Sequence, residues 1–222
     1  MSDIVTIHAL VEGETERLFV RELVAPHLQN RGIYMIPTFA GKQSGDVRFA
    51  RFIKDIRLFL RQREDSYVTV MVDFFRIGHD WPGRDEAFNE RTAAEKAEIL
   101  NRATAAEVAA RVDRVNTQRR FIPYVSMHEI EALLFSDARI LSEALDVDEN
   151  RIRAILDECG KPEEINDSPA TAPSKRLESL AASFKKKTTG ITVAKAIGLG
   201  PMREACPRFD EWLTRLEGLA PC

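Results

Sequence analysis

The stretch that decides the fold spans residues 4–16 and reads Ile4-Val5-Thr6-Ile7-His8-Ala9-Leu10-Val11-Glu12-Gly13-Glu14-Thr15-Glu16. It begins as an apolar run rich in β-branched residues, which predicts a strand buried on both faces. An acidic turn with one glycine follows, and a helical pattern begins directly after it. Glu12 is therefore predicted at the carboxyl end of a strand, where open α/β sheets place their ligands.

A second carboxylate, Glu16, follows Glu12 in the first predicted helical turn and can reach back toward the same point. Two carboxylates that face one point repel each other unless a cation or a shared proton lies between them. Mg²⁺ takes oxygen ligands and is commonly held by one or two carboxylates. A simpler interpretation is that Glu14 and Glu16 complement the helix dipole. It accounts for Glu14 fully and for Glu16 in part, but not for an acid at the strand end.

Composition places the chain among ordinary globular proteins. Its 222 residues suit one domain, or one domain with a helical appendage. The net charge of -3 and the pI near 5.9 give no overall attraction to nucleic acid, so such binding would need a local basic patch. Three cysteines without metal-ligand spacing suit a reducing cytoplasm. No apolar run is long enough to span a membrane, and we expect a cytoplasmic protein without membrane contact.

Four apolar runs alternate with helical patterns, near residues 4–11, 33–38, 67–72 and 121–125. This order predicts an α/β fold with a compact parallel four-stranded sheet and flanking helices. Pro123 favours an edge position for the fourth strand, because proline cannot donate to a ladder. The last third contains helical patterns and no convincing strand. We therefore expect an α/β domain over residues 1–137 and a helical extension over residues 138–222 packed on it.

Further acids follow the later strands. Asp73 ends the third apolar run much as Glu12 ends the first, and Asp80 lies in the loop after it. Glu131 and His128 lie three residues apart in a helical pattern after the fourth run, with Glu129 expected to point away from Glu131. Carboxylates from separate strand ends can share one or two Mg²⁺ ions. For His128, a packing role and a functional role are equally compatible with the pattern.

Two loops carry polar or basic residues. The loop over residues 40–46 has two glycines, a lysine and a serine, but its spacing matches no phosphate-binding signature, so an ordinary loop with occasional substrate contact is expected. The loop over residues 165–176 ends in Ser174, Lys175 and Arg176. We expect these three to fold back toward the acidic crevice, which without cations would repel phosphate. The alternative is that both cations point into solvent.

This pattern of acids at the ends of parallel strands resembles that of the TOPRIM (Rossmann-like) fold, which occurs in primases, type II topoisomerases and OLD-family nucleases. Residues 11–16 are similar to the opening TOPRIM motif, in the OLD form with a second acid four residues later. The likeness is closer to a TOPRIM-like group, domain-of-unknown-function family 4276. Its motifs recur at residues 11–16, 73–75 with 81–83, 128–137, 173–177 and 206–213.

The resemblance implies a Mg²⁺- or Mn²⁺-dependent nuclease that acts on nucleic acid beside an ABC- or SMC-like ATPase, in prokaryotic defence or DNA processing. It implies Glu12 and Asp73 as catalytic metal ligands, with Glu12 alternatively a general base, and Glu16 and Glu131 as further ligands. Lys175 or Arg176 would stabilise charge on the phosphate. Glu129 belongs to the same motif as Glu131, although Glu131 aligns better.

One departure leaves the chemistry open. TOPRIM enzymes carry a second Asp two residues after the first, whereas Asp73 is followed by Phe74 and Phe75. Either Asp80 takes its place, or the site holds one metal, or the domain is inactive and only binds the ATPase or a nucleic-acid end. A metal-dependent nucleotide phosphotransferase is a third alternative.

Overall fold

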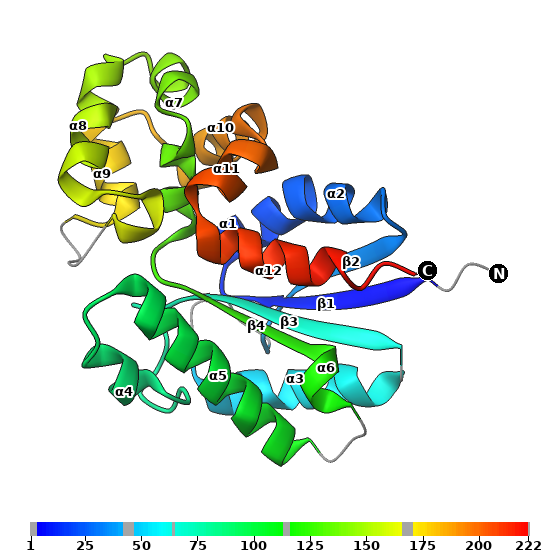
Figure 1. Ribbon diagram of the computed structural model, residues 1–222. Coiled ribbons are helices and arrows are strands. Elements are labelled where there is room, and N and C mark those ends of the chain that lie inside the picture. Colours follow the sequence, from blue (N-terminus) through cyan, green and yellow to red (C-terminus); the bar gives the residue numbers. More distant parts are fainter. Residues whose placement is uncertain (1–3, 42–46, 64, 113–115, 166–170, 222) are drawn as a thin grey trace.

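A parallel four-stranded sheet forms the centre of the computed structural model, which describes residues 4–41, 47–63, 65–112, 116–165 and 171–221 (Figure 1). Its strands are β1 (Val5–Val11), β2 (Ile33–Phe39), β3 (Ser66–Asp73) and β4 (Phe121–Ser126). The spatial order is β2-β1-β3-β4. The predicted α/β fold with four parallel strands is confirmed.

The strand register brings the ends of β1, β3 and β4 to one edge. Val11 pairs with Met71, and Asp73 pairs with Ser126. The carboxyl ends therefore lie side by side, and the chain leaves them at Glu12, Asp73 and Ser126. β4 lies at one edge of the sheet, as Pro123 predicted. Proline is tolerated there because it cannot donate a ladder hydrogen bond.

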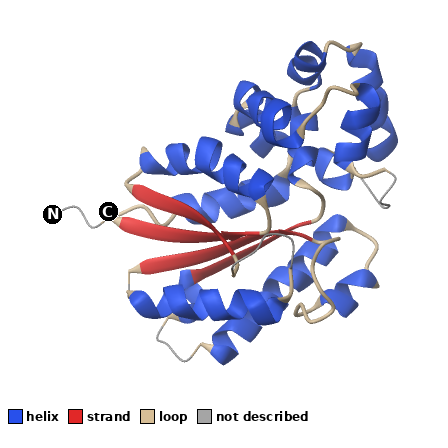
Figure 2. Ribbon diagram, turned by 180° about the vertical axis from the view of Figure 1, so that it is seen from behind, coloured by secondary structure: helices blue, strands red, loops and turns tan. Residues whose placement is uncertain are grey.

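Helices cover both faces of the sheet (Figure 2). They are α1 (Glu14–Phe19), α2 (Ala25–Gln29), α3 (Phe49–Gln62), α4 (Arg84–Phe88), α5 (Ala93–Arg111), α6 (Thr117–Arg120), α7 (Ala138–Leu145), α8 (Glu149–Cys159), α9 (Pro173–Leu180), α10 (Ile191–Ile197), α11 (Leu199–Ala205) and α12 (Pro207–Glu217). Short 3₁₀ helices span Ile130–Ser136 and Pro162–Glu164, and π-helical turns span Val20–Val24 and Lys186–Gly190. No helix in the described parts of the chain is long and apolar enough to cross a membrane.

Side-chain alternation along the strands divides the interior into two apolar clusters. On one face, Val70 and Val72 of β3 pack with α3 and α5. On the other face, Ile7 of β1 and Met71 of β3 pack with α1, α2 and the C-terminal helices. Because both faces are covered, the strands are nearly continuous apolar runs, as expected for parallel strands.

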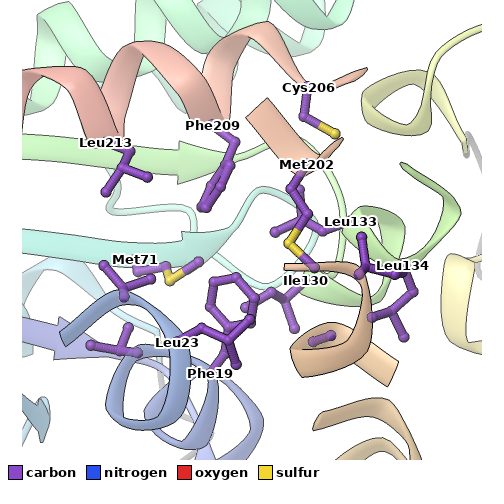
Figure 3. Close-up of a cluster of buried hydrophobic side chains, with 14 of the residues drawn as sticks. Phe19, Leu23, Met71, Ile130, Leu133, Leu134, Met202, Cys206, Phe209 and Leu213 are labelled. Atoms are coloured by element: carbon purple, nitrogen blue, oxygen red, sulfur yellow. The ribbon is translucent and has the colours of Figure 1, made fainter. Parts of the chain in front are cut away.

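The C-terminal third has two parts (Figure 1). Helices α7, α8 and α9 form a lobe beyond the carboxyl ends of the strands, whereas α12 returns to lie along the sheet. Met202 and Phe209 from this third meet Phe19 of α1 and Ile130 in one buried cluster (Figure 3). The division into residues 1–137 and 138–222 stays a prediction, and the second part shares the core of the first.

Three local features concern the first helix, the segment after β4 and the loop over residues 40–46. The first helix is interrupted by the π-helical turn before Pro26, which then occupies the first turn of α2. The helix expected after β4 is a 3₁₀ helix. The loop over residues 40–46, which includes Lys42, lies almost wholly outside the described residues.

A buried hydrogen bond attaches α12 to the sheet and leads to a stability prediction. Trp212 Nε1 donates to Thr69 Oγ1 at 2.9 Å, and the indole stacks on Tyr124 with ring centroids 4.9 Å apart. Trp212→Ala should lower the free energy of unfolding by about 3–5 kcal/mol, measured by urea denaturation. Glu211→Ala, on the exposed side of α12, should change it by less than about 0.5 kcal/mol. Equal, small effects would show that α12 does not pack on the sheet in solution.

Candidate metal and phosphate site

Glu12 leaves the end of β1 and points across to β3. Its Oε2 accepts a hydrogen bond from Asp73 N at 3.4 Å, and its Oε1 accepts one from Arg76 Nε at 3.0 Å. The side chain is only 10% exposed, whereas the Arg76 side chain is 58% exposed. Burial raises the pKa of Glu12 to about 7, the charge of Glu16 adds to the rise, and Arg76 opposes it.

Asp73, the last residue of β3, is buried beside Glu12. Its Oδ1 accepts a hydrogen bond from Phe75 N at 2.8 Å, which fixes the turn that follows the strand. Burial raises the pKa of Asp73 to about 8 against that hydrogen bond, and the charges of Glu12, Glu129 and Glu16 raise it further. The two strand-end carboxylates therefore share one small buried volume.

Glu16 reaches the same volume from the first turn of α1. Its pKa is raised by burial, with a contribution from the charge of Glu129. A Cβ on Gly13 would lie 3.0 Å from Glu16 Oε2, closer than nearly all Cβ contacts. The glycine in the acidic turn therefore gives this carboxylate room to fold back.

Glu129 and Glu131 come from the segment after β4, and Lys186 lies between them. Lys186 Nζ donates to Glu129 Oε1 at 2.6 Å and lies 3.5 Å from Glu131 Oε1. Glu129 Oε2 also accepts from Ser174 N at 3.0 Å. The two glutamates thus engage one ammonium, so the expectation that Glu129 points away from Glu131 is wrong.

Their ionisation differs because their partners differ. Burial raises the pKa of Glu131 to about 7, although the charge of Lys186 opposes the rise. For Glu129, burial acts in the same direction, but the hydrogen bonds from Lys186 and Ser174 prevail and lower its pKa. Glu131 Oε1 is buried and makes an ion-pair contact with Lys186 Nζ at 3.5 Å, without a geometrically good hydrogen bond.

We name Glu12, Glu16, Asp73, Glu129 and Glu131 the acidic cluster. Glu12 contacts the backbone of Asp73, Glu129 and Glu131 share the Lys186 ammonium, and the charges of Glu12, Glu129 and Glu16 add to the raised pKa of Asp73. As placed, no three His, Cys, Asp or Glu side chains among the described residues form a closed metal-binding arrangement. The donors nevertheless fit a hard divalent cation, since all are carboxylate oxygens and one is buried without a hydrogen bond.

Three predicted site residues have other partners. Asp80 accepts hydrogen bonds from Phe49 N at 3.1 Å and Ala50 N at 2.8 Å, so it caps the amino end of α3. Lys175 is paired with Glu178, and Arg176 with Glu158. Of the three residues expected to fold back toward the acidic crevice, Ser174 contacts Glu129 through its backbone N–H, whereas Lys175 and Arg176 pair with glutamates outside the cluster.

Lys186 is the site residue that sequence reasoning missed. It belongs to the run Lys185–Lys187, which adds positive charge late in the chain without a recognisable motif. Only the packing of the helices around α10 brings it to Glu129, 57 residues earlier. His128 is buried next to the cluster, and its ring lies nearly parallel to that of Phe75 with centroids 6.1 Å apart.

The raised pKa values predict how stability depends on pH. Because burial favours the protonated forms of Glu12, Asp73 and Glu131, metal-free protein should lose stability as pH rises through about 7 to 8. Asp73→Asn should remove part of this loss. Between pH 5 and pH 9 its melting temperature should therefore fall less than that of the wild type, by a difference of about 3 °C or more. Thermal melts in EDTA measure it. Glu178→Gln, on exposed α9, should retain the wild-type profile, and a parallel fall in all three proteins would contradict the assignment.

Comparisons with known proteins show which family the chain belongs to. The model of the family described as a domain of unknown function, DUF4276, matches residues 11–217. No curated protein matches the chain significantly in sequence. Among solved structures, the C-terminal region of the Burkholderia pseudomallei OLD protein is similar with a TM-score of 0.43 and 14% identity, over 95% of this chain and 99% of that one. The family match spans most of the sequence, and the chain therefore belongs to the domain-of-unknown-function family 4276.

Proposed function

We propose that this protein is a divalent-metal-dependent nuclease that hydrolyses phosphodiester bonds. The observation that carries the proposal is the acidic cluster, in which Glu12 contacts the backbone of Asp73 at neighbouring strand ends and Glu129 and Glu131 share the Lys186 ammonium. Glu12 and Asp73 would hold Mg²⁺ or Mn²⁺, with Glu16 and Glu131 as further ligands. An ion bound there would polarise the phosphate and lower the pKa of a bound water.

The residues of the chain would divide the remaining tasks. Glu12, with a pKa of about 7, is suited to accept a proton near neutral pH when it is not a ligand. Lys186, whose pKa is raised by its two glutamates against the effect of burial, stays charged and would stabilise a phosphate as its charge develops. We assign the stabilisation of the phosphate to Lys186 and not to Lys175 or Arg176, because among these three only Lys186 contacts the cluster.

Nucleic acid is supported as the substrate by a basic hollow beside the cluster. Lys185, Lys186 and Lys187 line this surface hollow of about 800 Å³ together with Ala182, Phe184, Thr188 and one acid, Glu178. Lys186 also faces Glu131, so the hollow adjoins the acidic cluster. Such a local patch is what a chain of net charge -3 needs to attract a phosphate backbone. An ABC- or SMC-like ATPase partner is part of this proposal through the TOPRIM resemblance.

A second candidate is a non-catalytic binding subunit. It is favoured by Lys186 and Arg76, which already compensate three of the carboxylates, and by the absence of a closed three-ligand arrangement among the described residues. The two candidates differ in what a divalent ion brings about. A nuclease cleaves nucleic acid when the ion is bound, whereas a binding subunit does not cleave with or without it.

Metal binding should raise thermal stability. At a Mn²⁺ concentration about a hundred times its Kd, the melting temperature at pH 8 should rise by about 5–10 °C, since binding to the folded state alone adds about 2.7 kcal/mol. Asp73→Asn should abolish most of this shift, while Asp80→Asn should retain it. An equal shift in Asp73→Asn would remove Asp73 from the site.

Cleavage should depend on Lys186 and not on Lys175. With Mn²⁺, wild-type protein should cut plasmid DNA or RNA, and EDTA should stop it. Lys186→Met should slow cutting by roughly a hundredfold, as loss of one transition-state cation does, whereas Lys175→Met should cut like wild type. Equal loss in both variants would contradict the role of Lys186. Metal binding without any cleavage by wild type would establish the binding subunit.

A further inference from the structure

A cavity of about 310 Å³ lies next to the acidic cluster and takes no part in the function proposed above. Its walls come from the turn after β3, the start of α5, the segment after β4 and the 3₁₀ helix at Pro162–Glu164. They are formed by Phe74, Phe75, Arg91, Thr92, Ala93, Lys96, Met127, His128 and Glu164. The cavity is thus lined by aromatic rings and cations, with one exposed carboxylate at Glu164.

Phe74 and Phe75 line this cavity, and Phe88, outside its wall, continues their row of rings. The Phe75 and Phe74 ring centroids lie 5.2 Å apart, and those of Phe74 and Phe88 lie 4.8 Å apart. Phe74 is buried, but Phe75 is 41% exposed and Phe88 is 47% exposed. Large apolar rings are costly to leave in water, so an exposed ring at a cavity wall offers a surface for stacking.

Cations accompany the same rings. Lys96 Nζ lies 5.7 Å from the centroid of Phe74, and the Arg84 guanidinium lies 4.4 Å from that of Phe88. Arg91 adds a further positive charge to the wall, while Glu95, which closes the capping box of α5, partly offsets it. Flat rings flanked by cations suit a ligand that is aromatic and negatively charged. Nucleotides have both properties.

We propose that this cavity holds an unpaired base of a single-stranded nucleic acid, with Phe75 as the stacking residue. The inference rests on the proposed nuclease function and names its substrate class. Phe75 N donates to Asp73 Oδ1, so the backbone of the stacking residue is fixed two residues from a cluster carboxylate. A base stacked on Phe75 would bring its neighbouring phosphate near the cluster. In a duplex the face of the base that would stack on Phe75 is already covered by the neighbouring base pair, so double strands should bind less well.

Fluorescence anisotropy with labelled oligothymidylate, oligouridylate and a blunt DNA duplex of equal length tests this, with Ca²⁺ as the divalent ion. Wild type should bind both single strands more tightly than the duplex. Phe75→Ala should weaken single-strand binding roughly five- to hundredfold, as loss of one stacked base does. Phe75→Trp should restore it. Tyr34→Ala removes a ring of similar exposure, 45%, from β2 and should leave binding unchanged.

The outcomes separate this proposal from the nuclease proposal. Equal single-strand affinity in wild type and Phe75→Ala, or tighter binding of the duplex, overturns the base pocket even when wild type cleaves. A loss in Phe75→Ala that Phe75→Trp restores supports the pocket even when no variant cleaves. No binding of either single strand by wild type also overturns it. Melting temperatures of all variants within a few degrees of wild type exclude misfolding as the cause.

Discussion

Repulsion among buried carboxylates is the constraint on which this site depends. Glu12, Asp73 and Glu131 are each nearly excluded from water, and each feels the charge of another acid. Such a group is stable only if protons, cations or a metal ion offset the charge. In the described structure Lys186 and Arg76 supply part of the compensation. Despite this compensation, burial and the neighbouring acids keep the pKa values of Glu12, Asp73 and Glu131 raised, so a bound cation would have charge left to offset.

The fold concentrates this charge through two features. Parallel strands end at a common edge, and the neighbouring positions of β1 and β3 bring Glu12 and Asp73 into contact. The C-terminal helices then cover that edge. Met202 and Phe209 pack with Phe19 and Ile130 (Figure 3). Lys186, from the same C-terminal third, contacts Glu129 and Glu131. The extension therefore supplies the cation as well as part of the core.

Local sequence patterns were sufficient for the sheet. The β-branched runs gave all four strands to within one or two residues, and Pro123 indicated the edge, because burial on both faces leaves a continuous apolar signal. The convergence of Glu12 and Asp73 also followed from strand ends. The helix type after β4 did not follow from the local pattern: Ile130–Ser136 is a 3₁₀ helix, and almost every side chain in it is buried.

The cations of the site could not be predicted in the same way. Lys175 and Arg176 stood in a recognisable motif, but Glu178 and Glu158, which lie near them after folding, pair with them instead. Asp80 likewise lies close to the acids in sequence yet caps α3. Lys186 reaches the cluster through helix packing over a long sequence separation, and no local pattern records such a contact. The positions of the acids at the strand ends could be predicted from sequence, whereas the contacts made by residues 138–222 could not.

Anomalous scattering from a crystal grown with Mn²⁺ would detect a divalent metal bound by the acidic cluster. We expect a manganese peak within about 2.0–2.6 Å of oxygens of both Glu12 and Asp73, with Arg76 displaced from Glu12. No peak at the cluster, with Arg76 and Lys186 still bound to their glutamates at saturating Mn²⁺, would contradict this expectation.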